Sequence, residues 1–241
     1  MDNRPGAVFC WSGGKDSALC LDKVLKENTY EVRYLLTTVN TNYNRISMHG
    51  VREDLLDLQA AAIGIPLLKV GVAEGTNDEY ERQMEWVLER AKFEGIRHVI
   101  FGDIFLEDLR AYRERNLGRI GMEALFPLWK SDTSVIIRDF ISRGFKALIC
   151  CTSDAFPGSD WLGRTIDEDF VRDLPAGVDP CGENGEYHSF CFEGPIFKKT
   201  IPFTAGEKVF HPFELEPGQE NQDLPGPSTN GFWYCDLLPG E

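Results

Sequence analysis

The chain lacks long apolar runs, a secretion signal and paired-cysteine motifs. Its apolar stretches, such as residues 98–106, are far shorter than the roughly 20 residues that a helix needs to cross a bilayer. Residues 1–9 do not show the charged-then-apolar pattern of a signal peptide. These features predict no membrane span, and they lead us to expect a cytoplasmic protein.

Cysteine and histidine are too scattered to indicate a metal centre. The seven cysteines form no CxxC pair and have no regular spacing, and the four histidines are spread along the chain. An odd number of cysteines in such a chain predicts reduced thiols, most of them buried as small apolar side chains. We expect neither disulfides nor a structural metal.

Basic side chains are in deficit. The chain carries 25 Lys and Arg against 39 Asp and Glu, which gives a formal net charge of −14. Proteins that bind nucleic acids usually have the opposite balance, because the neutralisation of phosphates drives their affinity. The charge therefore argues against a nucleic-acid partner. The basic run at residues 110–115 could supply charge to an anionic substrate or could form a solvated helix face.

What the sequence does contain is an alternation of apolar runs with amphipathic segments. The predicted strands are residues 7–11, 32–40, 66–72, 98–104 and 145–153, and the predicted helices are residues 17–28, 50–64, 77–94, 110–121 and 134–144. This alternation is typical of an α/β fold, a parallel sheet flanked by helices. Ligands bind such sheets at the carboxyl ends of the strands.

The pattern changes near residue 154. One short helix, a turn rich in Gly and Pro, and alternating strand-like residues follow, which together predict a smaller α+β lobe. We therefore expect a first domain over residues 1–153, a second lobe over 154–216 and an irregular C-terminal tail over 217–241. The final apolar residues, GFWYCDLL, could return to pack against the rest.

The segment SGGKDS, residues 12–17, joins the first predicted strand to the first predicted helix. A turn at this place presents free N–H groups and the positive end of a helix, which together attract anions. Its glycines allow close backbone approach, its serines add hydroxyl donors, and Lys15 can neutralise phosphate charge. Asp16 suits a magnesium ion carried by a nucleotide. The alternative is a glycine turn whose serines cap the helix.

A second candidate site is the turn DPCGENGEYHSF, residues 179–190. Glu183 and Glu186 could hold an amine or an ammonium ion, and His188 could act as a general base at neutral pH. Alternatively, these side chains cap the turn while the Asn-Gly pair between them forms a hairpin. The residues alone leave both interpretations open.

Two further candidates follow predicted strands. His49 lies in the loop after the second strand and could contact nucleotide or substrate, although a plain hydrogen-bonding role is equally open. Asp103 lies at the carboxyl end of the fourth strand, where it could contact magnesium or substrate.

The spacing of SGGKDS differs from that of a Walker A loop and resembles the SGGxDS signature of the PP-loop ATP pyrophosphatases. Four further segments occur in order, namely SMHG at 47–50, FGDI at 101–104, FPLW at 126–129 and DPCGENGEYHSF at 179–190. Together these motifs resemble the diphthine–ammonia ligase family over nearly the whole chain, to about residue 200.

The resemblance implies an adenine nucleotide alpha hydrolase-like fold, which is Rossmann-like and of the HUP type. It also implies an ATP-dependent ligase that uses Mg²⁺ and amidates a carboxylate with ammonia, releasing AMP and pyrophosphate. The nucleotide-binding residues that it implies are Ser12, Gly13, Gly14, Lys15, Asp16, Ser17, Met48, His49, Gly102 and Asp103. The catalytic residues are Asp16, which also meets the Mg²⁺ of ATP, Glu183, Glu186 and His188.

One motif departs from the family pattern. Members that make diphthamide are similar to GEGGEYET, whereas this chain reads GENGEYHS, with Asn184 in place of a Gly and His188 in place of a Glu. This variant resembles a largely bacterial branch that is associated with cobalamin salvage. The carboxylate could therefore be protein-borne or a corrinoid.

Several alternatives to the ligase stay open at this point. They are a cobalamin-salvage hydrolase acting on a corrinoid precursor, a tRNA-modifying enzyme of the same superfamily and a nucleotide-binding module without turnover. A homodimer is also left open.

Overall fold

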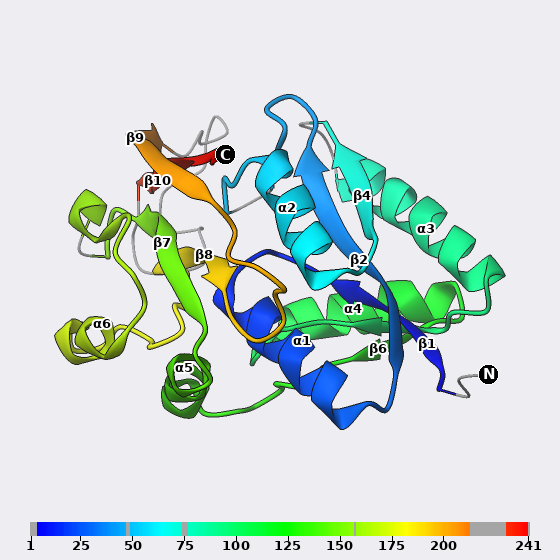
Figure 1. The fold of residues 1–241 in the computed structure, drawn as a ribbon. Helices are drawn as coiled ribbons and strands as arrows, with labels where there is room; N and C mark the ends of the chain where they lie inside the picture. Colours follow the sequence, from blue (N-terminus) through cyan, green and yellow to red (C-terminus); the bar gives the residue numbers. More distant parts are fainter. Residues whose placement is uncertain (1–3, 47–48, 74–76, 157, 213–229, 241) are drawn as a thin grey trace.

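The computed structural model describes residues 4–46, 49–73, 77–156, 158–212 and 230–240. Two β-sheets organise these residues, and they lie side by side in Figure 1. The first carries most of the helices, and the second belongs to the C-terminal lobe. The predicted α/β fold with a smaller C-terminal lobe is confirmed.

The first sheet is parallel apart from one short strand. Its strands are β1 (Gly6–Cys10), β2 (Glu31–Asn40), β3 (Arg45–Ile46), β4 (Leu67–Val72), β5 (His98–Ile100) and β6 (Glu123–Leu125). The central order is β4-β2-β1-β5-β6, and only β3 runs antiparallel, against the end of β2. The order reverses at β1, so a ligand is expected at the carboxyl end of that strand.

Helices cover both faces of this sheet (Figure 1). They are α1 (Lys15–Glu27), α2 (Glu53–Ile63), α3 (Asn77–Phe93) and α4 (Glu107–Arg119), whereas α5 (Thr133–Ser142) packs against α1 and α6 beside the second sheet. Ala7 and Phe9 of β1 belong to a core cluster with α1 and α2, whereas Val8 belongs to a separate cluster with α3 and α4. Because β1 is covered on both faces, its sequence is a continuous apolar run.

The second sheet is antiparallel and has the order β8-β7-β10-β9. Its strands are β7 (Lys146–Ser153), β8 (Tyr187–Glu193), β9 (Phe203–Pro212) and β10 (Gly231–Pro239), and η1 (Gly158–Trp161) and α6 (Glu168–Asp173) lie between β7 and β8. The strand predicted over 145–153 therefore exists but belongs to the second lobe, not to the domain predicted over 1–153. Its continuous apolar run is compatible with a buried strand in either sheet, so periodicity alone could not assign it.

The predicted irregular tail needs a similar correction. Residues 231–239 form β10, which pairs with β7 on one side and β9 on the other. Phe232, Trp233 and Tyr234 pack against the main core cluster, which supplies the driving force for this strand. Residues 217–229 lie outside the described residues.

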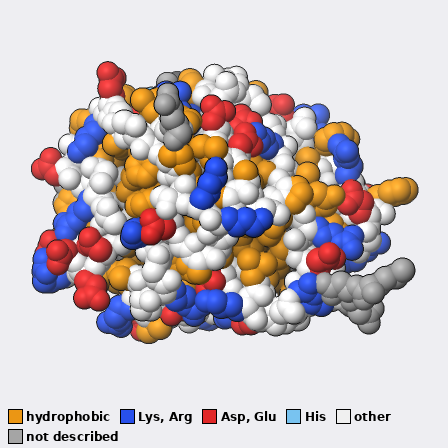
Figure 2. All heavy atoms as spheres, in the orientation of Figure 1, with side chains coloured by type: hydrophobic (Ala, Val, Ile, Leu, Met, Phe, Trp, Pro, Cys, Tyr) orange, Lys and Arg blue, Asp and Glu red, His pale blue; other side chains and the backbone are white. Residues whose placement is uncertain are grey.

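All seven cysteines lie in the described part of the chain and are unpaired, as predicted, and all but Cys10 are buried. Within the described residues, none of the helices combines the length and apolar character that crossing a bilayer requires. On the face shown in Figure 2, acidic and basic side chains are interspersed.

Candidate active site

A cavity of about 320 Å³ lies where β1 and β5 end, at the point where the strand order reverses. Its walls come from the loop after β1, from β2, from the loop after β5 and from the turn that precedes β8. Eight of the predicted site residues line it, namely Ser12, Asp16, Ser17, His49, Gly102, Asp103, Glu183 and His188. The fold thus brings together both candidate sites predicted from the sequence, the SGGKDS loop and the acidic turn.

The remaining predicted residues lie elsewhere. Gly13, Gly14, Lys15 and Glu186 are buried but are not part of the cavity wall, and Met48 falls outside the described residues. The two glycines allow the loop its backbone conformation and its close packing. Gly13 has φ +79°, a left-handed conformation that favours glycine, and a Cβ on Gly14 would lie 2.9 Å from His49 Cε1.

The SGGKDS loop is fastened to the second lobe. The N–H of Cys191 donates to the Gly13 carbonyl at 2.9 Å, and the N–H of Lys15 donates to Ser189 Oγ at 3.1 Å. By contrast, the N–H groups of Asp16 and Ser17 have no protein acceptor among the described residues. Free N–H groups in the first turn of α1 are the expected donors for a phosphate.

Lys15 does not point where the sequence predicted. Its ammonium group donates to the Cys181 carbonyl oxygen and to Asp16 Oδ2 at 2.8 Å, and it lies 5.0 Å from the ring centroid of Tyr187. Burial lowers its pKa, but Asp16 and the other anionic groups around it outweigh burial and hold the pKa well above its ordinary value. Lys15 is therefore a buried cation that joins the SGGKDS loop to the acidic turn.

Asp16 keeps one oxygen available. Oδ2 is paired with Lys15, whereas Oδ1 is buried and has no hydrogen-bond partner in the described part of the chain. An orphaned carboxylate oxygen in a cavity wall is costly unless a ligand satisfies it. Because Mg²⁺ prefers carboxylate and phosphate oxygens, the residues present fit a magnesium ion that arrives with a nucleotide.

Glu183 is the acidic side chain that the second lobe contributes to the cavity. Burial, followed by the nearby charge of Asp16, raises its pKa from 4.5 to about 8. Without a bound cation, the Glu183 carboxyl group is mostly protonated at neutral pH. A cation between these two carboxylates would favour the ionised form.

Glu186 faces the turn instead of the cavity. Its Oε1 accepts from the N–H of Asp179 at 3.0 Å and from Asn184 Nδ2 at 3.0 Å, and its Oε2 accepts from the N–H of Asn184 at 2.9 Å. Both oxygens are therefore occupied by the turn itself. For Glu186 the structure favours the capping alternative over the predicted ammonium contact.

The rings of His49 and His188 lie against each other in the cavity wall, with centroids 4.7 Å apart and planes tilted by 31°. Burial lowers the pKa of His49 to about 4, and burial together with the neighbouring His49 lowers the pKa of His188 well below its ordinary value. Both imidazoles are therefore neutral at pH 7. His49 is also held from the second lobe, since its Nδ1 lies 3.2 Å from the Ser189 carbonyl oxygen.

Asp103 pairs with Arg113, which the sequence indicated only as part of the basic run at residues 110–115. Arg113 Nε lies 2.8 Å from Asp103 Oδ2, and the guanidinium carbon lies 4.1 Å from the ring centroid of Phe101. Arg113 is the one Lys or Arg among the described residues of the cavity wall. Thr37, Thr38 and Tyr80, which line the cavity too, were missed because a strand interior and a helix start carry no specific signal.

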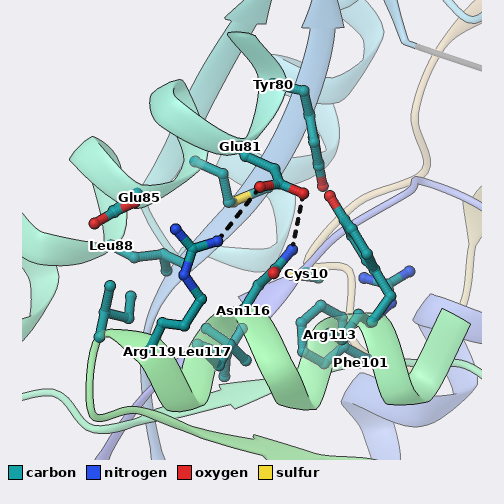
Figure 3. A pocket seen from close by; sticks show the side chains of 14 residues that line it. Cys10, Tyr80, Glu81, Glu85, Leu88, Phe101, Arg113, Asn116, Leu117 and Arg119 are labelled. Atoms are coloured by element: carbon teal, nitrogen blue, oxygen red, sulfur yellow. Dashed lines mark hydrogen bonds and ion pairs between the residues drawn. The ribbon is translucent and has the colours of Figure 1, made fainter. Parts of the chain in front are cut away.

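A smaller cavity of about 60 Å³ adjoins the first, between α3 and α4 (Figure 3). It shares with the larger cavity Cys10, Tyr80, Met84, Phe101 and Arg113. The Glu81 carboxylate at its rim is already held by Arg119 at 3.5 Å and Asn116 at 3.4 Å. The cavity is too small for a nucleotide, and these polar groups satisfy one another.

A parallel sheet with a glycine-rich loop and a helix N-terminus at its switch point defines a Rossmann-like nucleotide-binding protein. Residues 6–124 match the family model of the diphthamide synthase N-terminal domain, and residues 132–215 match that of the C-terminal domain. The chain belongs to the diphthamide synthase family. The two models meet ahead of β7, in agreement with the placement of that strand in the second lobe.

Curated relatives agree with this assignment. A mouse protein is 27% identical over 224 residues, which cover 83% of each chain. A human protein is 29% identical over 189 residues, covering 70% of this chain and 67% of the relative. Both are named diphthine–ammonia ligase. The family predicted from the motifs and the prediction of an ATP-dependent ligase are thereby confirmed.

Proposed function

We propose that this protein amidates a carboxylate substrate with ammonia in two steps at the cavity described above, forming AMP and pyrophosphate. One observation carries the proposal. Unpaired N–H groups at the start of α1 lie at the same cavity as the carboxylates of Asp16 from the first lobe and Glu183 from the second. An anion-binding end and a cation-binding end side by side suit a triphosphate, a magnesium ion and an ammonium ion.

The triphosphate would be held by the SGGKDS loop. Ser12, Asp16 and Ser17 line this end of the cavity, and the N–H groups of Asp16 and Ser17 together with the Ser12 hydroxyl would supply the donors. Mg²⁺ bound with ATP would meet Asp16 and would neutralise charge on the triphosphate. Donors that are already in place at the loop stabilise the charge that develops on the leaving pyrophosphate.

The acceptor carboxylate would lie against Arg113. This guanidinium is fixed by Asp103 and by the face of Phe101, so it can hold an anion without reorganising. In the first step a carboxylate oxygen attacks the α-phosphorus, and the bond from that phosphorus to the pyrophosphate oxygen breaks. The products of this step are an acyl adenylate and pyrophosphate.

Ammonia would approach from the side of the second lobe. Glu183 in its ionised form can hold an ammonium ion and take one proton from it, and the neutral His188 can take the second proton as the resulting ammonia forms the amide bond. In the second step the nitrogen attacks the acyl carbon and AMP leaves, which gives the amide. Glu186 supports this turn from behind through its bonds to Asp179 and Asn184.

The test is an oxygen-transfer experiment. The protein is incubated with MgATP, ammonium and a carboxylate labelled with ¹⁸O, and the panel includes a corrinoid carboxylic acid and a diphthine-bearing translation factor. The proposal expects AMP that carries one ¹⁸O, together with unlabelled pyrophosphate, for one member of the panel. ADP and phosphate as products, or AMP without the label, would contradict an acyl adenylate. The reactive member of the panel identifies the substrate.

A further inference from the structure

The C-terminal strand β10 lies beyond the residues that the two family models match, yet it contacts both ends of the loop that carries His49 of the cavity wall. It follows residues 213–229 in the chain and packs between β7 and β9. Its residue Asp236 faces the first lobe. The contacts of this carboxylate connect the last strand of the chain to the loop between β3 and α2.

Asp236 binds two arginines that bracket this loop. Its Oδ1 accepts from Arg45 Nη2 at 2.8 Å and from Arg52 Nε at 2.9 Å, and its Oδ2 accepts from Arg52 Nη2 at 2.7 Å. Arg45 lies in β3, and Arg52 directly precedes α2. The carboxylate therefore ties the beginning of the loop to its end, with a two-pronged contact to Arg52.

The same loop is held at its middle. Arg45 Nη1 donates to the Gly50 carbonyl at 2.7 Å, and the ring of Tyr234, two residues before Asp236, covers Gly50. Gly50 has φ +65°, and a Cβ at this position would lie 2.5 Å from Tyr234 Cδ1. Only glycine fits under this ring, so β10 and the loop are matched in shape as well as in charge.

These contacts fix the position of His49 in the cavity wall. Its ring lines the cavity, contacts the ring of His188 and lies against Gly14 of the SGGKDS loop. His49 is directly followed by the covered Gly50, and two residues separate it from Arg52. A change in the loop would therefore move an imidazole that forms part of the cavity wall.

We propose that Asp236 is a positioning residue for nucleotide binding, which acts by fixing, through Arg45 and Arg52, the loop that holds His49 in the cavity wall. This inference rests on the proposed function, because it assumes that the cavity binds MgATP. Through Asp236, β10 would support the nucleotide site although none of its residues lines the cavity.

The test compares D236N with D173N. Asp173 is a matched control, because it also pairs with two arginines, Arg164 at 2.5 Å and Arg172 at 3.2 Å, but it lies in α6 and does not line the cavity. The dissociation constant of MgATP is measured by calorimetry on each full-length variant. We expect D236N to bind about tenfold more weakly, because a charge-assisted contact is lost. D173N should stay within about twofold of wild type.

Two further readouts separate positioning from stability. The chain has four histidines, so the ring signals of His49 can be assigned by NMR, and they should shift in D236N but not in D173N. D236E, which keeps the charge, should recover part of the affinity. If D236N does not fold, R52Q replaces it in the same measurements.

Three results would count against the inference. Unchanged MgATP affinity in D236N, or a lower melting temperature without a change in affinity, would overturn it and leave the proposed function intact. Failure of the wild-type protein to bind MgATP would overturn both.

Discussion

The SGGKDS loop and the acidic turn meet in one cavity but differ in how their polar groups are satisfied. In the turn, Glu186 accepts three hydrogen bonds from Asp179 and Asn184. In the loop, Asp16 Oδ1 has no partner in the described part of the chain, and the N–H of Asp16 lacks a protein acceptor there as well. The turn is complete within itself, whereas the loop lacks partners that a ligand could supply.

This difference distinguishes side chains that are available to a ligand from side chains that support the turn, even where the two are equivalent in the sequence. Glu183 and Glu186 are equally good candidates for an ammonium contact, but only Glu183 lines the cavity. Lys15 looks like a phosphate ligand, but its ammonium group lies between the two regions and binds both.

The largest effect is expected for K15M. The ammonium of Lys15 is buried with a side-chain exposure of 4% and pairs with Asp16, so its removal leaves a carboxylate without its partner and a carbonyl without its donor. Breaking such a pair should lower the free energy of unfolding by about 3–5 kcal/mol. Urea denaturation measures this change. K92M, which removes an exposed pair with Glu89, should cost less than about 1 kcal/mol. Equal losses in the two variants would contradict the bridging role of Lys15.

The next largest effect is expected for D16N. The amide lacks the negative charge of the Asp16 carboxylate in the cavity wall, so the Mg²⁺-dependent part of ATP binding should weaken by roughly 10–100-fold. Titrations of ATP with and without Mg²⁺ measure this part. D22N changes an aspartate of the same helix that pairs with Lys26 and Arg143 and does not line the cavity. D22N should keep the Mg²⁺ dependence, and a D16N protein that also keeps it would argue against a magnesium contact.

E186Q should reduce stability without reducing nucleotide affinity. The new amide group places a donor against the N–H of Asn184, so one of the turn's bonds is lost inside a buried site. We expect a loss of about 1–3 kcal/mol in the free energy of unfolding, with MgATP affinity unchanged. E183Q is the matched variant on the cavity side of the same turn, and at pH 7 it should be at least as stable as the wild type, because the unfolded wild-type chain releases the Glu183 proton that the folded protein retains. The reverse pattern would mean that the assignment of the two glutamates is wrong.

A further effect concerns pH. The pKa of Glu183 rises from 4.5 to about 8 on folding, so between these values the folded protein retains a proton that the unfolded chain releases. The stability of the wild-type protein should therefore decrease, relative to E183Q, as the pH rises from 5 to 8. Melting temperatures of both variants across this range measure the difference. Parallel profiles would show that Glu183 does not titrate abnormally.

Most of the first lobe could be predicted from the sequence, because strand and helix alternate there with clear periodicity. The site loop could also be predicted, since glycines and serines between a strand and a helix have few other uses. Motifs located the acidic turn, but they could not show which of Glu183 and Glu186 faces the cavity. That depends on the side of the turn to which each Cβ points.

Other features depend on contacts between segments far apart in the chain. The place of β7 in the second sheet follows from its pairing with β8 and β10, and no local pattern records that pairing. Asp236 lies 191 residues from Arg45, and its role is visible only when β10 has returned to the first lobe. The direction of Lys15 likewise requires the Cys181 carbonyl from the other lobe.

The most direct test of the central claim is hydrogen–deuterium exchange of the backbone amides with and without MgATP. The claim is that the SGGKDS loop binds the triphosphate and that the acidic turn is already complete. The account predicts strong protection of residues 12–18 on adding MgATP and little change at residues 183–186. Protection of the turn with no change in the loop would contradict it.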